Sequence, residues 1–231
     1  MKQKYSKNLM NIAAVALVAS VGGNANATTL TFNAGASNNT AVGSSYGTDN
    51  TADNVEFITS DGSGTTPNIA LLWPGAALEF HSDTRWADIE EVSNDDPDTH
   101  ILQMNQSQSN RTIQFTPDAG WSVLFNSVDF GFGTGMSAAS SIGTVTITRD
   151  FDSSVVKTVS TGTLNKGTAT TLDLTYTGLV GESYTLEFTS SVSENWGAID
   201  DLSFSQTAVP EPSSAALLGL GGLALILRRR K

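Results

Sequence analysis

Three segments in the second half of the chain alternate regularly between apolar and polar residues, and this alternation constrains the fold more than any other feature. They read GTVTITRD (143–150), TLDLTYTG (171–178) and SYTLEFTS (183–190). A period of two places the apolar side chains on one face of a β-strand and the polar ones on the other. Each segment therefore predicts a strand with one buried and one solvated face.

Shorter segments of similar content predict further strands, and turn sequences separate them. The additional strand candidates are 29–32, 55–59, 77–81, 112–116, 123–132 and 155–159. Residues 116–120 and 165–167 are typical turn sequences. No stretch of the body, residues 28–208, has the periodicity of an amphipathic helix of normal length. Nine or more short strands without helical crossovers predict an all-β fold, an antiparallel β-sandwich, with a closed barrel as the alternative.

The first 27 residues have the composition of a secretory signal peptide. Three lysines precede the apolar run 12–21, which is too short to span a bilayer. Small residues then occupy positions 25 and 27, the two that signal peptidase reads, so cleavage after Ala27 is predicted. The alternative is a short N-terminal anchor or a core helix. We expect an exported chain whose mature part begins at residue 28.

Residues 213–227 are apolar or small and uncharged, and four cations follow them. As a helix this segment would be about 22 Å long, shorter than the ~30 Å hydrocarbon core, so insertion requires thinned lipid or snorkelling flanks. Positive flanks stay cytoplasmic, so the body would be tethered outside the inner membrane. Pro210 and Pro212 stop a helix from extending upstream. We therefore expect an extended, protease-accessible junction between body and anchor.

The terminal sequence VPEPSSAALLGLGGLALILRRRK (209–231) resembles a PEP-CTERM sorting signal, with a Pro-Glu-Pro triplet, a small-residue apolar stretch and an arginine-rich end. The residues that carry the motif are Pro210, Glu211, Pro212, Arg228, Arg229 and Arg230. The resemblance implies recognition by an exosortase, a membrane cysteine protease-transpeptidase, and then release or transfer to the cell surface or exopolysaccharide matrix. Hosts of this family are mostly Gram-negative, biofilm-forming bacteria. The alternative is an ordinary tail anchor that contains two prolines.

These ends divide the chain into a signal peptide (1–27), a β-sandwich domain (28–208) and a sorting signal with a transmembrane helix (209–231). The middle part has 22 acidic and five basic side chains, a net charge of −17. Such a charge repels nucleic acids and anionic lipids, so neither is expected as a partner. The chain has no cysteine, and about 180 residues can bury a core without disulfides.

The segment NWGAIDDLSFSQ (195–206) resembles the final strand of galactose-binding-like jelly rolls, and 113–132 resembles segments of sandwich domains that carry this tag. In those jelly rolls an acid of the closing strand often supports a structural calcium, and Asp200 matches it. Strict alternation from Leu202 and Phe204 predicts that Asp200 and Trp196 face inward, which is costly for an unpaired carboxylate. The alternatives to calcium are a bulge that turns Asp200 outward, or backbone N–H groups that satisfy it.

Tryptophan rings suggest a binding function. Trp86 lies among polar residues in HSDTRWADIEE, and Trp73 precedes Pro74 at the end of a strand. Exposed rings can cover the apolar faces of sugars, so both are candidates for binding extracellular polysaccharide, against the alternative that they pack in the core. Trp121 follows a turn and begins a hydrophobic strand, so it is predicted to be a core residue.

Patterns for catalysis are few, and we expect that the protein is not an enzyme. GSSYG (43–47) matches the nucleophile motif at Ser45, but that chemistry needs a strand before the serine, a helix after it and an oriented histidine, and this match lies in a Ser/Gly/Asn/Thr loop where such patterns arise by chance. The chain's histidines are His81 and His100, and a triad of Ser45, an aspartate at 95, 96 or 98, and His100 is possible in chain order. Hydrolysis of sugars needs two carboxyl groups about 5–10 Å apart. The chain has several neighbouring acids, such as Glu90 and Glu91, and the sequence context distinguishes none of these pairs. The expected function is an exported surface or matrix protein. A structural matrix protein without a ligand and a secreted hydrolase are the alternatives.

Overall fold

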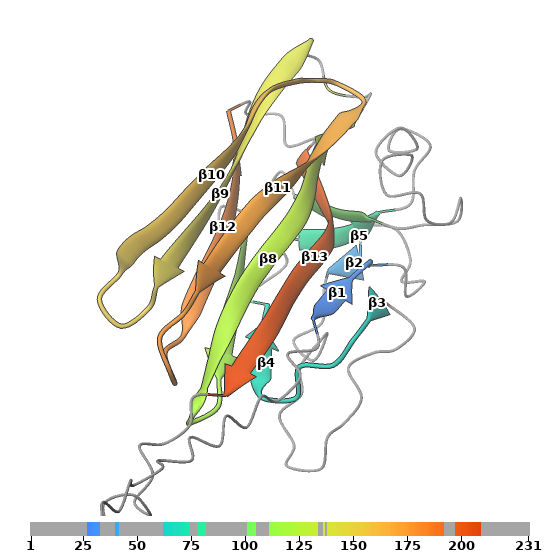
Figure 1. The fold of residues 1–231 in the computed structure, drawn as a ribbon. Helices are drawn as coiled ribbons and strands as arrows, with labels where there is room; N and C mark the ends of the chain where they lie inside the picture. The colour runs from blue at the N-terminus through green and yellow to red at the C-terminus, as the bar shows by residue number, and fades with distance from the viewer. Residues whose placement is uncertain are drawn as a thin grey trace, which may run out of the picture.

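The computed structural model describes residues 27–32, 40–41, 62–73, 78–81, 101–104, 111–133, 136, 138–191 and 197–208. Within these residues the fold is all β, with thirteen strands in two antiparallel sheets that pack face to face (Figure 1). The predicted antiparallel sandwich is confirmed, and the described strands form two separate sheets rather than one closed barrel.

Sheet A has eight strands, in the order β11-β8-β13-β6-β5-β2, with β1 beside β13 and β3 beside β1. Their bounds are β1 Thr28–Leu30, β2 Thr40–Ala41, β3 Gly62–Ser63, β5 Leu78–His81, β6 Ile101–Met104, β8 Trp121–Phe132, β11 Thr168–Thr177 and β13 Gly197–Ala208. The long strands β8 and β13 pair along their whole length, from Gly197 opposite Phe132 to Ala208 opposite Trp121. They form the centre of the sheet.

Sheet B has five strands, in the order β10-β9-β12-β7-β4. Their bounds are β4 Ile69–Leu72, β7 Thr112–Pro117, β9 Ser140–Arg149, β10 Ser154–Asn165 and β12 Tyr184–Ser190. The three regularly alternating segments correspond to β9 and β12 of this sheet and to β11 of sheet A. In β12 the alternate residues Tyr184, Leu186 and Phe188 are buried, as the period of two predicts.

An aromatic cluster joins the two sheets. Phe115 of sheet B packs edge-on against Phe125 and Phe204 of sheet A, with ring centroids 4.9 and 5.1 Å apart. Tyr184 of sheet B lies 6.1 Å from Phe125, again edge-on. All four rings are fully buried. Because edge-to-face contacts have a preferred geometry, this cluster helps to fix how the sheets stack.

The register places the turns at two ends of the sandwich. At the lower end in Figure 1 lie the turns 118–120, 150–153 and 178–183, together with Ala208, where β13 stops. We call this the tail end, because the last 23 residues of the chain follow Ala208. The opposite end contains the turn 166–167, where the chain crosses from sheet B to sheet A.

Both predicted turns are confirmed, around Gly120 and Gly167. These glycines have φ of 84° and 75°, left-handed conformations that glycine adopts without steric cost. The sequence patterns do not predict the short strands β2, β3, β4 and β6, which have two to four residues and no clear alternation. The predicted strand 55–59 lies outside the described residues.

In the part of the chain that the structure describes, no helix has the length and hydropathy that crossing a membrane requires. Residues 1–26 of the predicted signal peptide and the apolar stretch 213–227 lie outside that part.

Candidate functional site

Two aspartates lie side by side on the outer face of sheet A. Asp200 of β13 and Asp129 of β8 are direct partners in the register, whereas Ile199 pairs with Phe130 on the core face. Directly opposed residues have Cβ atoms about 5 Å apart. Asp200 is 5% exposed and Asp129 is 8% exposed. Both carboxylates are therefore buried, although they point away from the core between the sheets.

A β-bulge explains the outward direction of Asp200. The register with β8 shifts between Asp200 and Ser203, and Asp201 adopts a φ of 45°. The extra residue returns Leu202 to the core, where it is fully buried, while Asp200 stays on the outer face. The inward direction that strict alternation predicts is therefore wrong, and the alternative of a bulge is confirmed.

The Asp200 carboxylate also satisfies the backbone at this bulge. The amide of Asp201 donates a hydrogen bond of 2.8 Å to Asp200 Oδ1. A bulge interrupts the ladder of inter-strand hydrogen bonds, so a buried amide there needs another acceptor. The second alternative to a metal, a carboxylate that accepts from a backbone N–H group, is thus observed.

The aspartate pair offers the donor type that calcium prefers, because calcium ligands are carboxylate and carbonyl oxygens and water. Among the described residues, no group of three or more His, Cys, Asp or Glu side chains is placed to hold a metal ion. Two carboxylates would leave several of calcium's six to eight positions to carbonyls and water. Calcium at Asp200 stays a prediction, and Asp129 is the neighbour that would share the ion.

Asp129 is not among the residues that the sequence patterns single out, although a signal for it exists. It interrupts the largely apolar segment VLFNSVDFGF (123–132). Aspartate is rarely buried unless it is paired, so an acid inside a central strand indicates a special environment. Its partnership with Asp200 could not be predicted, because that depends on the pairing of β8 with β13.

The structure places two of the four tryptophans. Trp73 is 4% exposed and packs edge-on against Phe32, with ring centroids 6.2 Å apart. This corrects its assignment as a sugar-binding residue, because a ring inside the core offers no face to a ligand. Trp121, a predicted core residue, is only half-buried at the start of β8. Trp86 and Trp196 lie outside the described residues.

The predicted processing residues lie at the edges of the described chain or beyond them. Ala27 is exposed and directly precedes β1, so cleavage after it would leave that strand intact. The sorting residues Pro210, Glu211, Pro212, Arg228, Arg229 and Arg230 lie outside the described residues, as do Ser45 and His100.

The tail end contains an ion-pair network around Arg149. Its guanidinium donates two hydrogen bonds to Glu182, from Nη2 to Oε1 at 2.6 Å and from Nε to Oε2, and Nη1 lies 3.4 Å from Asp152. The hydrogen bond with Glu182 raises the pKa of Arg149 above its ordinary value and lowers the pKa of Glu182. The network joins the turn 150–153 to the turn 178–183.

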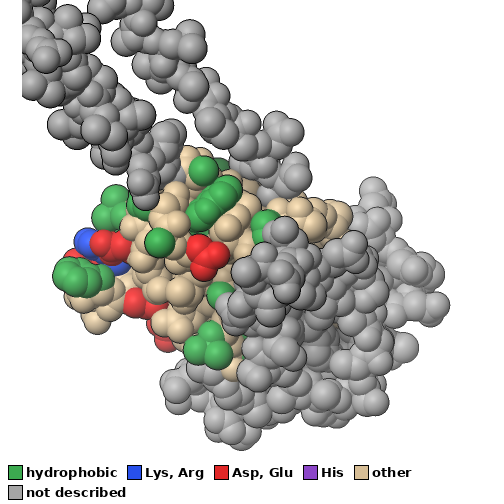
Figure 2. All heavy atoms as spheres, turned by 90° about the horizontal axis from the view of Figure 1, so that it is seen from below, with side chains coloured by type: hydrophobic (Ala, Val, Ile, Leu, Met, Phe, Trp, Pro, Cys, Tyr) green, Lys and Arg blue, Asp and Glu red, His purple; other side chains and the backbone are tan. Residues whose placement is uncertain are grey.

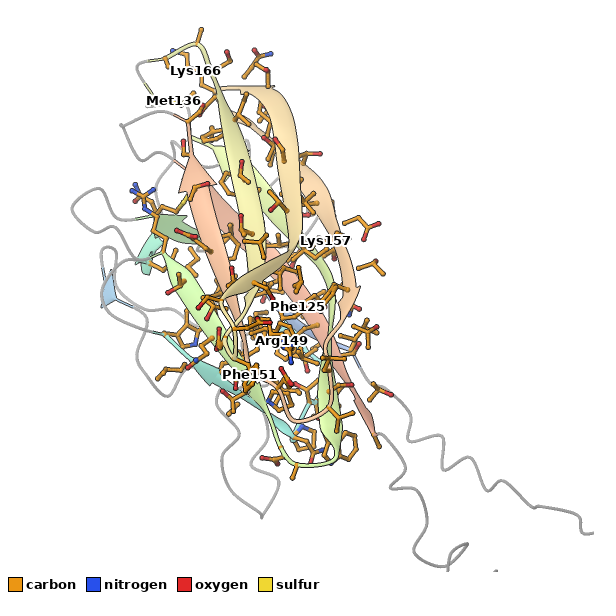
Figure 3. The ribbon with its side chains drawn as sticks, turned by 90° about the vertical axis from the view of Figure 1, so that its left-hand side faces the viewer. Phe125, Met136, Arg149, Phe151, Lys157 and Lys166 are labelled. Atoms are coloured by element: carbon orange, nitrogen blue, oxygen red, sulfur yellow. The ribbon has the colours of Figure 1, made fainter. Side chains whose placement is uncertain are left out.

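Three apolar side chains project from these two turns. Phe151 is 82% exposed, Leu179 is 52% exposed and Val180 is 43% exposed. The Arg149 guanidinium lies 5.2 Å from the centroid of the Phe151 ring, and the two residues lie close together in Figure 3. Figure 2 looks onto the tail end and shows hydrophobic side chains separated by polar and acidic groups. The sequence patterns do not single out these residues.

The turn that holds Phe151 is braced by hydrogen bonds on both sides. Asp150 accepts from Gln114 Nε2 and from Thr185 Oγ1, each at 2.7 Å. Asp152 Oδ1 accepts from the backbone amide and the hydroxyl of Ser154, and these bonds lower the pKa of Asp152. Phe151 is therefore an exposed aromatic ring on a turn whose shape is well supported.

Residues 208–231 match a family described as the PEP-CTERM protein-sorting motif. The match starts at the last residue of β13 and contains the Pro-Glu-Pro triplet, the apolar stretch and the terminal arginines. This motif implies an exported protein that an exosortase processes and that is associated with the cell surface. No curated protein matches the chain.

Three solved structures are similar to part of this chain at low identity. The Clostridium thermocellum endo-1,4-β-D-xylanase 10B CBM22-1–GH10 modules with xylohexaose are 12% identical, with a TM-score of 0.35 over 64% of this chain and 27% of theirs. The arabinose-bound MgGH51 α-L-arabinofuranosidase is 17% identical, with a TM-score of 0.37 over 80% of this chain and 27% of its own.

The third structure, infectious bursal disease virus strain Gx, is 14% identical, with a TM-score of 0.29 over 82% of this chain and 54% of its own. This chain thus spans only about a quarter of the first two proteins. At these TM-scores the similarities say nothing about function.

Proposed function

We propose that this chain is a surface or matrix protein of a Gram-negative bacterium, delivered through an exosortase, and that its sandwich binds extracellular polysaccharide. The observation that supports delivery is the position of the sorting motif, which begins at Ala208, where the closing strand β13 ends. None of the described strands comes from the tail beyond this residue. An exosortase can therefore remove the tail without taking a strand from the described sheets.

The sorting part is tested with the full chain in a host that has an exosortase. Replacing Glu211 by Ala, or deleting residues 228–231, should leave the protein in the inner membrane or cause its loss. Fractionation and immunoblotting would show this distribution. A Lys166→Ala variant, which changes an exposed cation of the body, serves as the control. Unchanged secretion of both tail variants would contradict the proposal.

For the ligand, we propose a polysaccharide of the extracellular matrix. The destination supports this class, and the net charge of −17 disfavours nucleic acids and other polyanions unless a cation bridges the two. Trp86, whose sequence neighbours are polar, is the residue we propose to contact the sugar. Since Trp73 lies in the core, it has no part in this proposal.

A glycan array tests this ligand with the secreted protein, with and without calcium. The expected result is retention on one class of polysaccharide and at least a tenfold loss in Trp86→Ala. Phe151→Ala, which removes an exposed aromatic ring at the tail end, should bind as the parent does. If no glycan is retained and Trp86→Ala changes nothing, the alternative of a structural matrix protein replaces this proposal. Cleavage of a retained glycan would instead indicate the hydrolase.

A further inference from the structure

We propose that the tail end of the sandwich docks on the bilayer surface while the chain is tethered. Phe151, Leu179 and Val180 would enter the headgroup region and hold the body in one orientation, with the junction 209–212 at the membrane where an exosortase works. This inference rests on the proposed function, because it requires that the tail is inserted in a membrane.

Exposed apolar side chains are concentrated at this end. The described residues include six large hydrophobic side chains that are exposed: Leu72, Ile142, Phe151, Val155, Leu179 and Val180. Three of them lie in two of the three turns of the tail end, 150–153 and 178–183, and Val155 is the second residue of β10, which follows the first of these two turns. The surface is therefore suited to an apolar or interfacial partner.

Hydrogen bonds place the turn 178–183 next to the exit of the tail. The amide of Gly181 donates to the carbonyl oxygen of Trp121 at 2.7 Å, and Trp121 is the register partner of Ala208. The amide of Leu179 donates to Tyr184 Oη at 2.8 Å, which supports the same turn from inside. Leu179 and Val180 are thus fixed beside the point where the chain continues into the sorting signal.

The length of the tail decides which partner this end meets. Four residues, 209–212, separate Ala208 from the apolar stretch, and six do so if Ser213 and Ser214 remain outside the hydrocarbon. Six extended residues span at most about 20 Å, while the headgroup region on each side of the hydrocarbon is about 5–8 Å thick. The tail end is therefore held at or near the lipid surface whenever the tail is inserted.

Charge specifies the kind of lipid. Asp118, Asp152 and Glu182 surround the exposed turns, and the cation there, Arg149, is already paired with Glu182 and Asp152. The net negative rim should be repelled by anionic headgroups and tolerated by zwitterionic ones. The contact is therefore hydrophobic in origin, and we expect it on phosphatidylcholine or phosphatidylethanolamine.

The tether makes a weak contact sufficient. Three partly inserted side chains bind little on their own, but a short tether raises their effective concentration at the membrane, to the order of millimolar. Cleavage of the tail removes that advantage, and the body then leaves the surface. Docking would in this way hold the uncleaved precursor at the membrane, and the body would be released after an exosortase has removed the tail.

The experiment uses single-cysteine labelling, which the absence of cysteine from the chain makes unambiguous. The precursor, isolated from a host without an exosortase, carries an environment-sensitive fluorophore at Ala119→Cys or at Ala139→Cys. Both alanines are exposed; the first is in a turn of the tail end and the second accepts a hydrogen bond from Lys166 at the opposite end (Figure 3). Each protein is mixed with phosphatidylcholine–phosphatidylethanolamine vesicles.

We expect a blue shift of the label at position 119 and none at position 139. The combined change Phe151→Ser and Leu179→Ser should abolish the shift at 119 while the protein still floats with the vesicles. Ile142→Ser, which removes an exposed apolar side chain near the other end, should leave the shift unchanged. Added phosphatidylglycerol should reduce the shift.

The results separate this inference from the proposed function. Flotation without a blue shift at position 119, or an equal shift at both positions, would overturn docking and leave tail insertion intact. A precursor that does not float with the vesicles would contradict tail insertion and docking together. Thermal unfolding of the serine variants checks that they are folded.

Discussion

The two sheets use the same antiparallel ladder but differ in their outer faces. On sheet B, the outward residues of β9 and β12 are exposed or half-buried. On sheet A, four residues on the outer face of the central strands, Ser122, Asp129, Asp200 and Ser205, are buried, whereas others such as Leu124 and Thr207 are half-buried. A strand with one solvated face alternates in sequence, whereas a strand buried on both faces need not. The comparison shows why periodicity describes β12 well and β13 poorly.

The largest expected effect distinguishes the core from the outer face of sheet B. Phe125→Ala removes a ring at the centre of the aromatic cluster and should lower the free energy of unfolding by about 3–5 kcal/mol. Val155→Ala, on the outer face of sheet B, should change it by no more than about 0.5 kcal/mol. Urea unfolding followed by fluorescence measures both values. Equal losses would mean that the outer face of sheet B is covered in solution.

The second prediction compares carboxylates on the two outer faces. Asp200→Ala removes the carboxylate that accepts a hydrogen bond from the Asp201 amide and should cost about 1–3 kcal/mol of unfolding free energy. Asp200→Asn keeps an oxygen at that position and should cost clearly less. Glu187→Ala, at an exposed site of sheet B, is the control and should have little effect. If Asp200→Ala is as harmless as Glu187→Ala in urea unfolding, the outer face of sheet A is not a buried environment.

The third prediction concerns Tyr176, a residue of sheet A that packs against Tyr184 of sheet B. Burial, together with a hydrogen bond to Tyr184, raises the pKa of Tyr176 from 10.0 to about 12. Because the folded protein favours the neutral phenol, this stabilisation is complete below pH 10 and is lost as the pH rises through 12. Melting temperatures should therefore fall between pH 10 and 12, and less so in Tyr176→Phe. An equal fall in both proteins would assign the alkaline loss to other groups.

The smallest expected effect lies at the tail end. Arg149 lowers the pKa of Glu182 from its ordinary value of 4.5. A carboxyl group with a lowered folded-state pKa stabilises the protein above pH 4.5, and this stabilisation disappears as the pH falls through the folded-state value. Glu182→Gln should flatten the loss of melting temperature between pH 5 and pH 3 slightly, because the pair is near the surface. A steeper loss in the variant would contradict this assignment.

Much of the fold can be predicted from the sequence where strands are long and half-solvated. The segments that became β9, β11 and β12 alternate visibly, and Gly120 and Gly167 mark the turns before β8 and β11 as expected. Prediction fails where geometry depends on a partner strand. The bulge at Asp201 is defined by the register between β13 and β8. No local pattern in the sequence shows that alternation is interrupted there, so alternation alone predicts that Asp200 faces the core.

The candidate site is less predictable than the fold, for two reasons. Asp129 and Asp200 are 71 positions apart in the sequence, so only strand pairing brings them together. Trp73 has the local sequence of a strand end, and its burial involves the contact with Phe32, which follows β1 in the chain. The sorting motif, by contrast, is read from a linear sequence and does not depend on packing, which is why residues 210–230 could be assigned before the fold.

The pairing of β13 also determines how the body responds to mechanical load. A pull on the chain at Ala208, directed along the strand, acts in shear on the whole β13–β8 ladder, and the neighbouring strands β1 and β6 share it on the other edge. Hydrogen bonds loaded in this direction must break together rather than one after another. A sandwich held by its last strand can therefore resist drag from flowing water while its attachment lasts.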